Sequence, residues 1–269
     1  MTRTLLSQDQ LQRFERQGVL RIDGLLSPEG VRTARAALLR PLEKLGLWQD
    51  GGWKLDAVPR PRWPASGPKT ATAIGHKHPE LKALAKEPKV QALIDELLDG
   101  RKADSAQGPQ VLFTLPNSEE WFVPHGWHPE LPRLKSGGRP GIQIFAFLDP
   151  VGPRSGGTMA VSGSHQLLDG GRQLRAPDVR RELCREPFFR ALYSEATARQ
   201  VSADARARVD GVELGLVEMT GEPGDAYVVD LRTLHSGAPN ASDRPRLMMT
   251  QRFIRADLQA ELAEAYGWS

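Results

Sequence analysis

The sequence predicts a mainly β protein with flanking helices, and we expect residues 1–269 to form a single domain. Helical spacing dominates the first third of the chain, whereas strand-like runs separated by turn formers dominate from about residue 110 onward. Large β-sandwiches and barrels often reach this length without dividing into two domains. Hydrophobic residues make up 39% of the chain and charged residues 26%, which agrees with an ordinary globular protein.

Residues 1–109 are expected to form a helical shoulder together with the first strands. Two helical patterns between Ser7 and Glu43 flank a short strand-like run, Val19 to Ile22. Ser27 followed by Pro28 is typical of a helix N-cap and the first helical position, so the second helix should begin there.

A loop and a further helix complete this shoulder. Residues 49–69 are rich in glycine and proline, which favours an irregular loop, and we expect it to border the mouth of a functional site. The run His78-Pro79-Glu80 then opens a helix that is predicted to extend from Leu81 to Leu98.

The β core is expected over residues 110–165 and 209–255, with a polar, partly helical insert over residues 166–208. Long insertions between strands can close over a site and set its specificity, so this insert is predicted to be lid-like. Its apolar residues are the expected underside of the lid, although packing of the insert onto the core would explain them equally well. They are Leu183, Phe188, Phe189, Leu192 and Tyr193.

His128 and Glu130 are candidate ligands of one metal ion. In extended backbone, residues two apart project from the same face, so both side chains can reach the ion while Pro129 points away. A histidine from another strand would complete the set of two histidines and one carboxylate that holds non-haem Fe(II) and leaves positions open for a co-substrate and dioxygen. His235 is the candidate for this third ligand.

Arg246 is a candidate for binding an acid close to that metal. Residues 236–243 are dense in turn formers, so the chain is expected to reverse after His235 and to return as a strand from Arg246 to Phe253. This return would bring Arg246 beside His235. A guanidinium offers a planar fork of donors that matches a carboxylate, so it suits the distal carboxylate of 2-oxoglutarate. The residues expected to share its face are Met248, Thr250 and Arg252.

Further motifs lie in a fixed order along most of the chain, and their order and spacing are more specific than any one of them. They are Leu6–Leu20, Leu25–Glu29, His78–Leu81, His128–Glu130, Phe147–Pro150, Gly156–His165, Gly224–Ala226, His235 and Arg246. In these motifs the chain resembles the phytanoyl-CoA dioxygenase-like branch of the Fe(II)/2-oxoglutarate oxygenases.

The resemblance implies a double-stranded β-helix, also called a jelly roll, as the core of the fold. It implies that His128, Glu130 and His235 bind Fe(II), that Arg246 and Phe145 bind the co-substrate 2-oxoglutarate, and that O2 is consumed. The implied reaction is hydroxylation of a small-molecule metabolite with release of succinate and CO2. Glu130 stands where this branch usually has aspartate. A carboxylate there argues against the halogenating relatives, in which a small residue leaves room for chloride.

Several alternatives stay open at this stage. The same iron chemistry could end in desaturation, cyclisation or epimerisation instead of hydroxylation. The chain could also be a non-catalytic jelly-roll binding protein that keeps the ligands without turnover. Zinc-dependent hydrolysis is a further alternative, because two histidines and a glutamate can hold zinc, but Arg246 would then have no evident purpose.

Four residues are predicted to contact the substrate. His125 and Trp127 adjoin the metal motif, where loop residues often carry function, although simple packing would also explain them. Arg172 and Arg175 belong to an arginine-rich stretch of the insert that could face an anionic substrate. Acidic residues at helix-like spacings in the same stretch favour an ordinary solvated helix face as the competing interpretation.

The expected partner is a small molecule. The net charge of +3 is modest and the basic residues alternate with acidic ones, which is untypical of a nucleic-acid-binding protein. No apolar run approaches the roughly 20 residues that span a bilayer, and the first residues lack the apolar core of a secretory signal. We therefore expect a cytoplasmic enzyme with no membrane association and no obligate protein partner.

Overall fold

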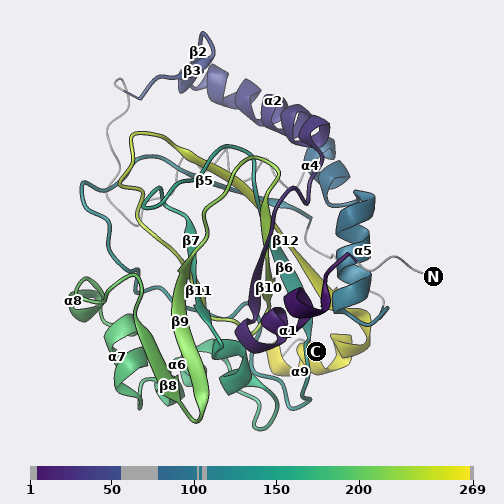
Figure 1. Cartoon of the computed structure of the whole chain (residues 1–269), viewed down its shortest axis with the longest axis vertical. Coiled ribbons are helices and arrows are strands. Elements are labelled where there is room, and N and C mark those ends of the chain that lie inside the picture. Colours follow the sequence, from purple (N-terminus) through teal and green to yellow (C-terminus); the bar gives the residue numbers. More distant parts are fainter. Residues whose placement is uncertain (1–4, 56–77, 102, 105–107, 267–269) are drawn as a thin grey trace.

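Two antiparallel β-sheets face each other and enclose an apolar interior (Figure 1). The computed structural model describes residues 5–55, 78–101, 103–104 and 108–266. The strands of these residues are β1 (Val19–Ile22), β2 (Trp48–Gln49), β3 (Gly52–Trp53), β4 (Ala103–Asp104), β5 (Gln110–Thr114), β6 (Gly141–Phe147), β7 (Thr158–Ser162), β8 (Arg206–Val209), β9 (Val212–Glu218), β10 (Ala226–Asp230), β11 (His235–Gly237) and β12 (Arg246–Arg255).

The larger sheet has the strand order β1-β10-β6-β12-β4, with β5 also paired to β12, and the smaller sheet has the order β11-β7-β9-β8. The expected jelly-roll core, mainly β with flanking helices, is confirmed. The helices are α1 (Gln8–Gln17), α2 (Pro28–Lys44), α4 (Pro79–Leu84), α5 (Pro88–Leu97), α6 (Ala176–Leu183), α7 (Pro187–Tyr193), α8 (Glu195–Ala198) and α9 (Gln259–Tyr266), with 3-10 turns η2 (Ser164–Leu168) and η3 (Ala256–Leu258).

Strand alternation divides the side chains of the larger sheet between its two faces. Along β12, Leu247 and Met249 pack in the outer cluster under the helices, whereas Met248 lies in the interior between the sheets. On β6, Ile144 is likewise an outer residue and Phe145 an interior one. Because successive residues of a strand point to opposite faces, Arg246, two residues before Met248, is directed to the interior as well.

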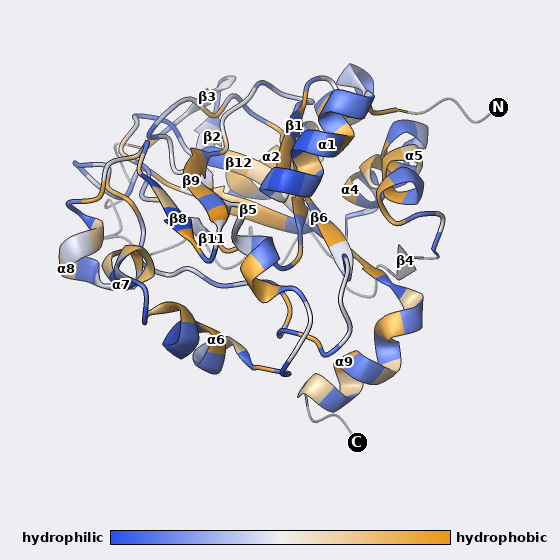
Figure 2. Ribbon diagram, turned by 60° about the horizontal axis from the view of Figure 1, so that its bottom comes forward, coloured by the Kyte–Doolittle hydropathy of each residue, from blue (hydrophilic) through white to orange (hydrophobic). Residues whose placement is uncertain are grey.

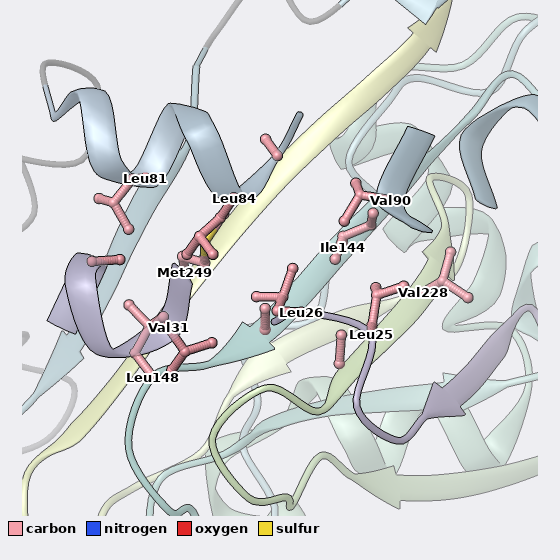
Figure 3. Close-up of a cluster of buried hydrophobic side chains, with 14 of the residues drawn as sticks. Leu25, Leu26, Val31, Leu81, Leu84, Val90, Ile144, Leu148, Val228 and Met249 are labelled. Carbon is pink, nitrogen blue, oxygen red and sulfur yellow. The ribbon is translucent and has the colours of Figure 1, made fainter. Parts of the chain in front are cut away.

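Helices α2, α4 and α5 cover the outer face of the larger sheet (Figure 1). Figure 3 shows the apolar side chains at this junction, among them Val31 of α2, Leu84 of α4 and Ile144 of β6. Burying such side chains is the main stabilising contribution of the layer, at about 25 cal/mol for each Å² of apolar surface removed from water.

Helices α6 and α7 cover the outer face of the smaller sheet, where Phe189 and Leu192 are fully buried against Met159 and Val161 of β7. Helix α9 packs elsewhere, with Leu262 against Leu131 in the segment that carries the metal motif. Each helix carries both hydrophobic and hydrophilic residues, as expected for elements that bury a single face (Figure 2). Among the described residues, no helix is long and apolar enough to cross a membrane.

The predicted N-terminal elements are confirmed, and their local causes are visible. The side chain of Ser7 accepts a hydrogen bond from the backbone of Gln10, and the Gln10 side chain bonds back, forming a capping box at the start of α1. At the start of α2 the side chain of Ser27 accepts a hydrogen bond from Gly30 N, and Pro28 takes the first helical position.

The helix predicted from Leu81 to Leu98 is instead two helices. α4 ends at Leu84, and α5 begins at Pro88 after Glu87, whose backbone is extended, with ψ at 142°. The proline ring disfavours helical geometry in the preceding residue and removes a helical N–H donor, so the break follows from Pro88.

Two further expectations concern the return strand after His235 and the loop over residues 49–69. The return strand predicted from Arg246 to Phe253 is present as β12, and it belongs to the larger sheet, whereas His235 lies on β11 of the smaller sheet. Of the loop predicted over residues 49–69, the described part contains strands β2 and β3, which pair in a short hairpin. Residues 56–77 lie outside the described part of the chain.

Candidate metal centre

The candidate metal centre forms where two chain segments pair through one residue of each, in an isolated β-bridge. His128 and His235 exchange both backbone hydrogen bonds, at N···O distances of 3.1 and 3.0 Å, and Glu130 N donates to Leu231 O at 2.9 Å. His128 forms an isolated bridge and not the strand that the sequence predicted. This pairing places the two imidazole rings side by side, with centroids 4.6 Å apart.

His128, Glu130 and His235 each direct one ligand atom to a common position, and these atoms lie within 4.8 Å of one another. Both histidines are oriented by a backbone carbonyl two residues earlier. His128 Nδ1 lies 2.9 Å from Gly126 O, and His235 Nδ1 lies 3.1 Å from Thr233 O. Because Nδ1–H donates to the carbonyl, the lone pair of each Nε2 is left for a metal ion.

The protonation states of this group suit metal binding. Burial lowers the pKa of His128, and the neighbouring His235 lowers it further, so the ring is neutral at pH 7. Burial alone would raise the pKa of Glu130, but the contact with His235 and the charge of Arg252 outweigh it and keep this pKa below its usual value. A neutral imidazole and an ionised carboxylate are the forms in which His128 and Glu130 bind a metal.

Arg246 lies in the interior at the start of β12 and has the properties of an anion-binding residue. It is 8% exposed, and its Nη1 and Nη2 donate to Gly156 O at 2.6 Å and to Thr114 Oγ1 at 2.7 Å. Its Nε has no hydrogen-bond partner among the described residues, nor do these residues supply a carboxylate to pair with it. Burial lowers the pKa of Arg246 to about 10, so it stays cationic at neutral pH.

A buried cation without a counter-charge is costly, so Arg246 is stabilised by any anion that can reach it. The guanidinium carries five N–H donors, of which the two contacts use two, and it therefore retains donors for a carboxylate. Phe145 lies on the neighbouring strand β6, paired in register with Thr250 of β12. Its buried ring meets His235 edge-on at 5.6 Å and forms an apolar wall beside the metal position.

The four predicted substrate contacts lie at different depths. Trp127 is 4% exposed and packs in the cluster beneath the insert, facing away from its neighbour His128. His125 is half-buried in the segment that leads to His128. Arg172 is exposed and lies 3.6 Å from Glu182, and Arg175 is the exposed N-cap residue of α6. The role of these four residues in substrate binding stays a prediction.

Two residues of the site were not assigned a role from the sequence. Thr114 holds Arg246 because β5 pairs with β12 in register, and Arg252 contacts Glu130 because β12 passes the metal segment. Strand alternation did place Arg252 on the face of Arg246. Its contact with Glu130 depends on how distant segments pack, which has no local sequence signal.

The fold and the site together define a double-stranded β-helix with a 2-His-1-carboxylate metal position and a buried arginine, Arg246, in the interior between the sheets. A model of the family described as phytanoyl-CoA dioxygenase (PhyH) matches residues 14–248, which is most of the chain. The chain therefore belongs to this family, whose members are Fe(II)- and 2-oxoglutarate-dependent oxygenases. Comparison with curated proteins found none that matches.

Several solved structures share the fold over nearly the whole chain. The carbocyclase SnoK from nogalamycin biosynthesis is 20% identical, with a TM-score of 0.59 and coverage of 94% of this chain and 85% of that one. HygX from Streptomyces hygroscopicus, solved with nickel and 2-oxoglutarate bound, is 17% identical, with a TM-score of 0.58 and coverage of 93% and 88%. AviO1 from Streptomyces viridochromogenes Tue57 is 21% identical, with a TM-score of 0.57 and coverage of 95% and 97%.

Proposed function

We propose that this protein uses Fe(II), 2-oxoglutarate and O2 to hydroxylate a small-molecule metabolite, with release of succinate and CO2. The observation that supports this most is the buried Arg246, which has no carboxylate partner among the described residues, in a chain that also assembles three metal ligands. A zinc hydrolase would need the ligands but not this arginine, because its water nucleophile carries no distal carboxylate.

The residues of this chain divide the work between metal and co-substrate. His128, Glu130 and His235 would hold Fe(II), and the bound iron with 2-oxoglutarate would supply the oxidising power for a substrate C–H bond. Arg246 would bind the distal carboxylate of 2-oxoglutarate through its remaining donors. Phe145 would exclude water from one side of the metal and keep the co-substrate in place.

A small-molecule substrate is supported by the chemistry of the fold neighbours. SnoN is described as an epimerase and was solved with Fe3+, alpha ketoglutarate and a nogalamycin compound, and EctD was solved with 2-oxoglutarate and 5-hydroxyectoine. At 16–18% identity these neighbours show the fold alone, so a small-molecule substrate comes to this chain only as part of the proposal. Desaturation, cyclisation and epimerisation would use the same three ligands, so they remain alternative outcomes of the same proposal. His125, Trp127, Arg172 and Arg175 remain the proposed substrate contacts.

Anaerobic titration of the purified protein with Fe(II) and then 2-oxoglutarate tests the proposal. We expect a weak visible charge-transfer band that requires both additions and is lost or strongly weakened in Arg246→Ala. Arg244→Ala is the matched control, because it removes an exposed arginine two residues away, and it should keep the full band. A wild type that binds Fe(II) but develops no band would instead favour the non-catalytic binding protein or the zinc enzyme.

A further inference from the structure

Arg252 lies beside the metal position on β12, and the proposed function assigns it no role. We propose that Arg252 is a positioning residue, which holds Glu130 so that a single oxygen of its carboxylate faces the metal. The inference rests on the proposed function and deepens it, because it concerns how this chain prepares the same centre.

The two oxygens of Glu130 have different partners. Arg252 Nη1 lies 2.8 Å from Oε1, whereas Oε2 lies 3.4 Å from His235 Nε2, on the side of the metal position. A carboxylate that bound the ion through both oxygens would place Oε1 between two cations, the metal and the Arg252 guanidinium, which would compete for it. The contact therefore favours one-oxygen binding, which leaves one more coordination position for the co-substrate or O2.

Glu130 needs such a restraint more than an aspartate would. The side chain of glutamate has one more torsion than that of aspartate, and its terminal torsion is broad, so the carboxylate can turn either oxygen or both toward an ion. Ordering this torsion costs conformational entropy each time the metal binds. An ion pair that already exists in the metal-free protein fixes the torsion in advance.

Arg252 is itself held in place. Its Nη2 donates to Gln110 Oε1 at 3.1 Å, and its backbone pairs in register with Gln143 of β6. The side chain is 24% exposed, so burial alone does not fix it. The hydrogen bond to Gln110 and the strand pairing hold it on the interior face of β12. Arg252 orients Glu130, just as the carbonyls of Gly126 and Thr233 orient the two histidines, so each ligand has an outer partner.

The positive charge of Arg252 has the opposite effect on metal affinity. A guanidinium next to a metal position repels the incoming cation, and it also lowers the negative charge that Glu130 offers. If repulsion prevailed, removing Arg252 would tighten metal binding. If positioning prevails, as we propose, removing it weakens binding, so the two effects differ in sign.

Anaerobic metal titration of three variants separates positioning from repulsion. Arg252→Gln removes the charge and the fork, Arg252→Lys keeps the charge but loses the fork, and Arg255→Gln removes another arginine of β12 that pairs with Asp257. We expect Arg252→Gln to weaken Co(II) or Fe(II) affinity by roughly 10- to 100-fold, the range found for partners of metal ligands. Arg252→Lys should fall between it and the wild type, and Arg255→Gln should match the wild type.

The absorption spectrum of bound Co(II) gives a readout that a purely structural role would not change. In Arg252→Gln the freed carboxylate can bind through both oxygens, so the spectrum should shift toward higher coordination number, whereas Arg255→Gln should keep the wild-type spectrum. Thermal unfolding of the metal-free variants checks that they fold. Should Arg252→Gln fail to fold, Arg252→Lys is tested in the wild type and in Glu130→Asp. The shorter aspartate carboxylate lies farther from position 252, so the lysine substitution should weaken metal affinity less in Glu130→Asp than in the wild type.

The results that overturn the proposal are distinct from those that overturn the proposed function. Equal affinities and spectra in the wild type and both Arg252 variants would show that Arg252 does not position Glu130. Tighter binding in Arg252→Gln, with Arg252→Lys unchanged, would show that repulsion prevails. A wild type that binds Fe(II) but forms no band with 2-oxoglutarate leaves the positioning of Glu130 standing and overturns only the oxygenase. A wild type that binds no metal overturns both.

Discussion

His165 is a buried histidine outside the metal centre, and its environment favours the neutral ring. It is 5% exposed, its Nε2 lies 3.0 Å from Glu15 O, and its Nδ1 has no hydrogen-bond partner among the described residues. Burial lowers the pKa of His165, and the nearby Arg232 and Arg139 lower it further, although Asp230 opposes them. The folded protein therefore takes up a proton at this ring only at lower pH than the unfolded chain does.

This difference predicts a loss of stability in mild acid. As the pH falls below about 6.5, the unfolded chain binds a proton at His165 before the folded protein does, so the free energy of unfolding decreases. The decrease ends once the pH falls below the lowered pKa of the folded state. Urea denaturation between about pH 7 and pH 5 should show a steeper decline in the wild type than in His165→Gln, by at most about 1.4 kcal/mol per pH unit. Parallel declines would contradict the assignment.

At this same scale, the metal ligands could be predicted from sequence but their supporting residues could not. His128 and Glu130 are two residues apart, so extended backbone alone brings them to one face. Thr114 and Arg252 act through contacts with Arg246 and Glu130 that depend on register between distant segments. Such contacts exist only once the sheets are assembled.

Among the elements, α1 is attached closely to the segment that leads into the metal centre. It ends at Gln17 and is capped by Gly18, whose φ of +66° is left-handed. Gly18 O accepts hydrogen bonds from Asp230 N at 2.9 Å and from Thr233 Oγ1 at 3.0 Å, just before His235. A Cβ at this position would collide with the side chains of His165 and Thr233.

Two glycines with similar backbone but different surroundings test this contact. Gly18→Ala should lower the free energy of unfolding by about 2–4 kcal/mol, from left-handed strain and overpacking together. Gly24→Ala has φ +59° with nothing within 4 Å of the added Cβ, so it should cost only the strain, about 1 kcal/mol. Chemical denaturation of both variants gives the comparison. Equal losses would mean that α1 can shift away from His165 without cost.

Elements with strong local signals were predicted, and those set by long-range pairing were not. The caps at Ser7 and Ser27 mark helix starts correctly, because capping is local. The break at Pro88 also had a local signal, which the apolar periodicity through residues 81–98 obscured. The separation of β11 and β12 into facing sheets had none, since turn residues indicate a reversal but not the sheet that the chain joins next.

Over the whole molecule, the site joins segments that are far apart in sequence. The metal ligands come from the segment after β5 and from β11 of the smaller sheet, whereas Arg246 comes from β12 of the larger sheet. Arg246 also donates to Gly156 O, just before β7 of the smaller sheet. A metal ion and a bound acid would thus link the two sheets only in the folded state.

Binding should therefore stabilise the fold in two separate steps. A ligand that binds only the native state adds about 2.7 kcal/mol at 100 times its Kd, which raises the melting temperature by several degrees in a protein of this size. Under anaerobic conditions we expect one increment from Fe(II) and a second from 2-oxoglutarate that appears only after the metal, and a chelator should remove both. His235→Ala should lose both increments, while His165→Gln, which removes a buried histidine that is not a ligand, should keep them. An increment from 2-oxoglutarate of the same size without metal would mean that Arg246 binds the acid alone and that the metal centre is not coupled to it.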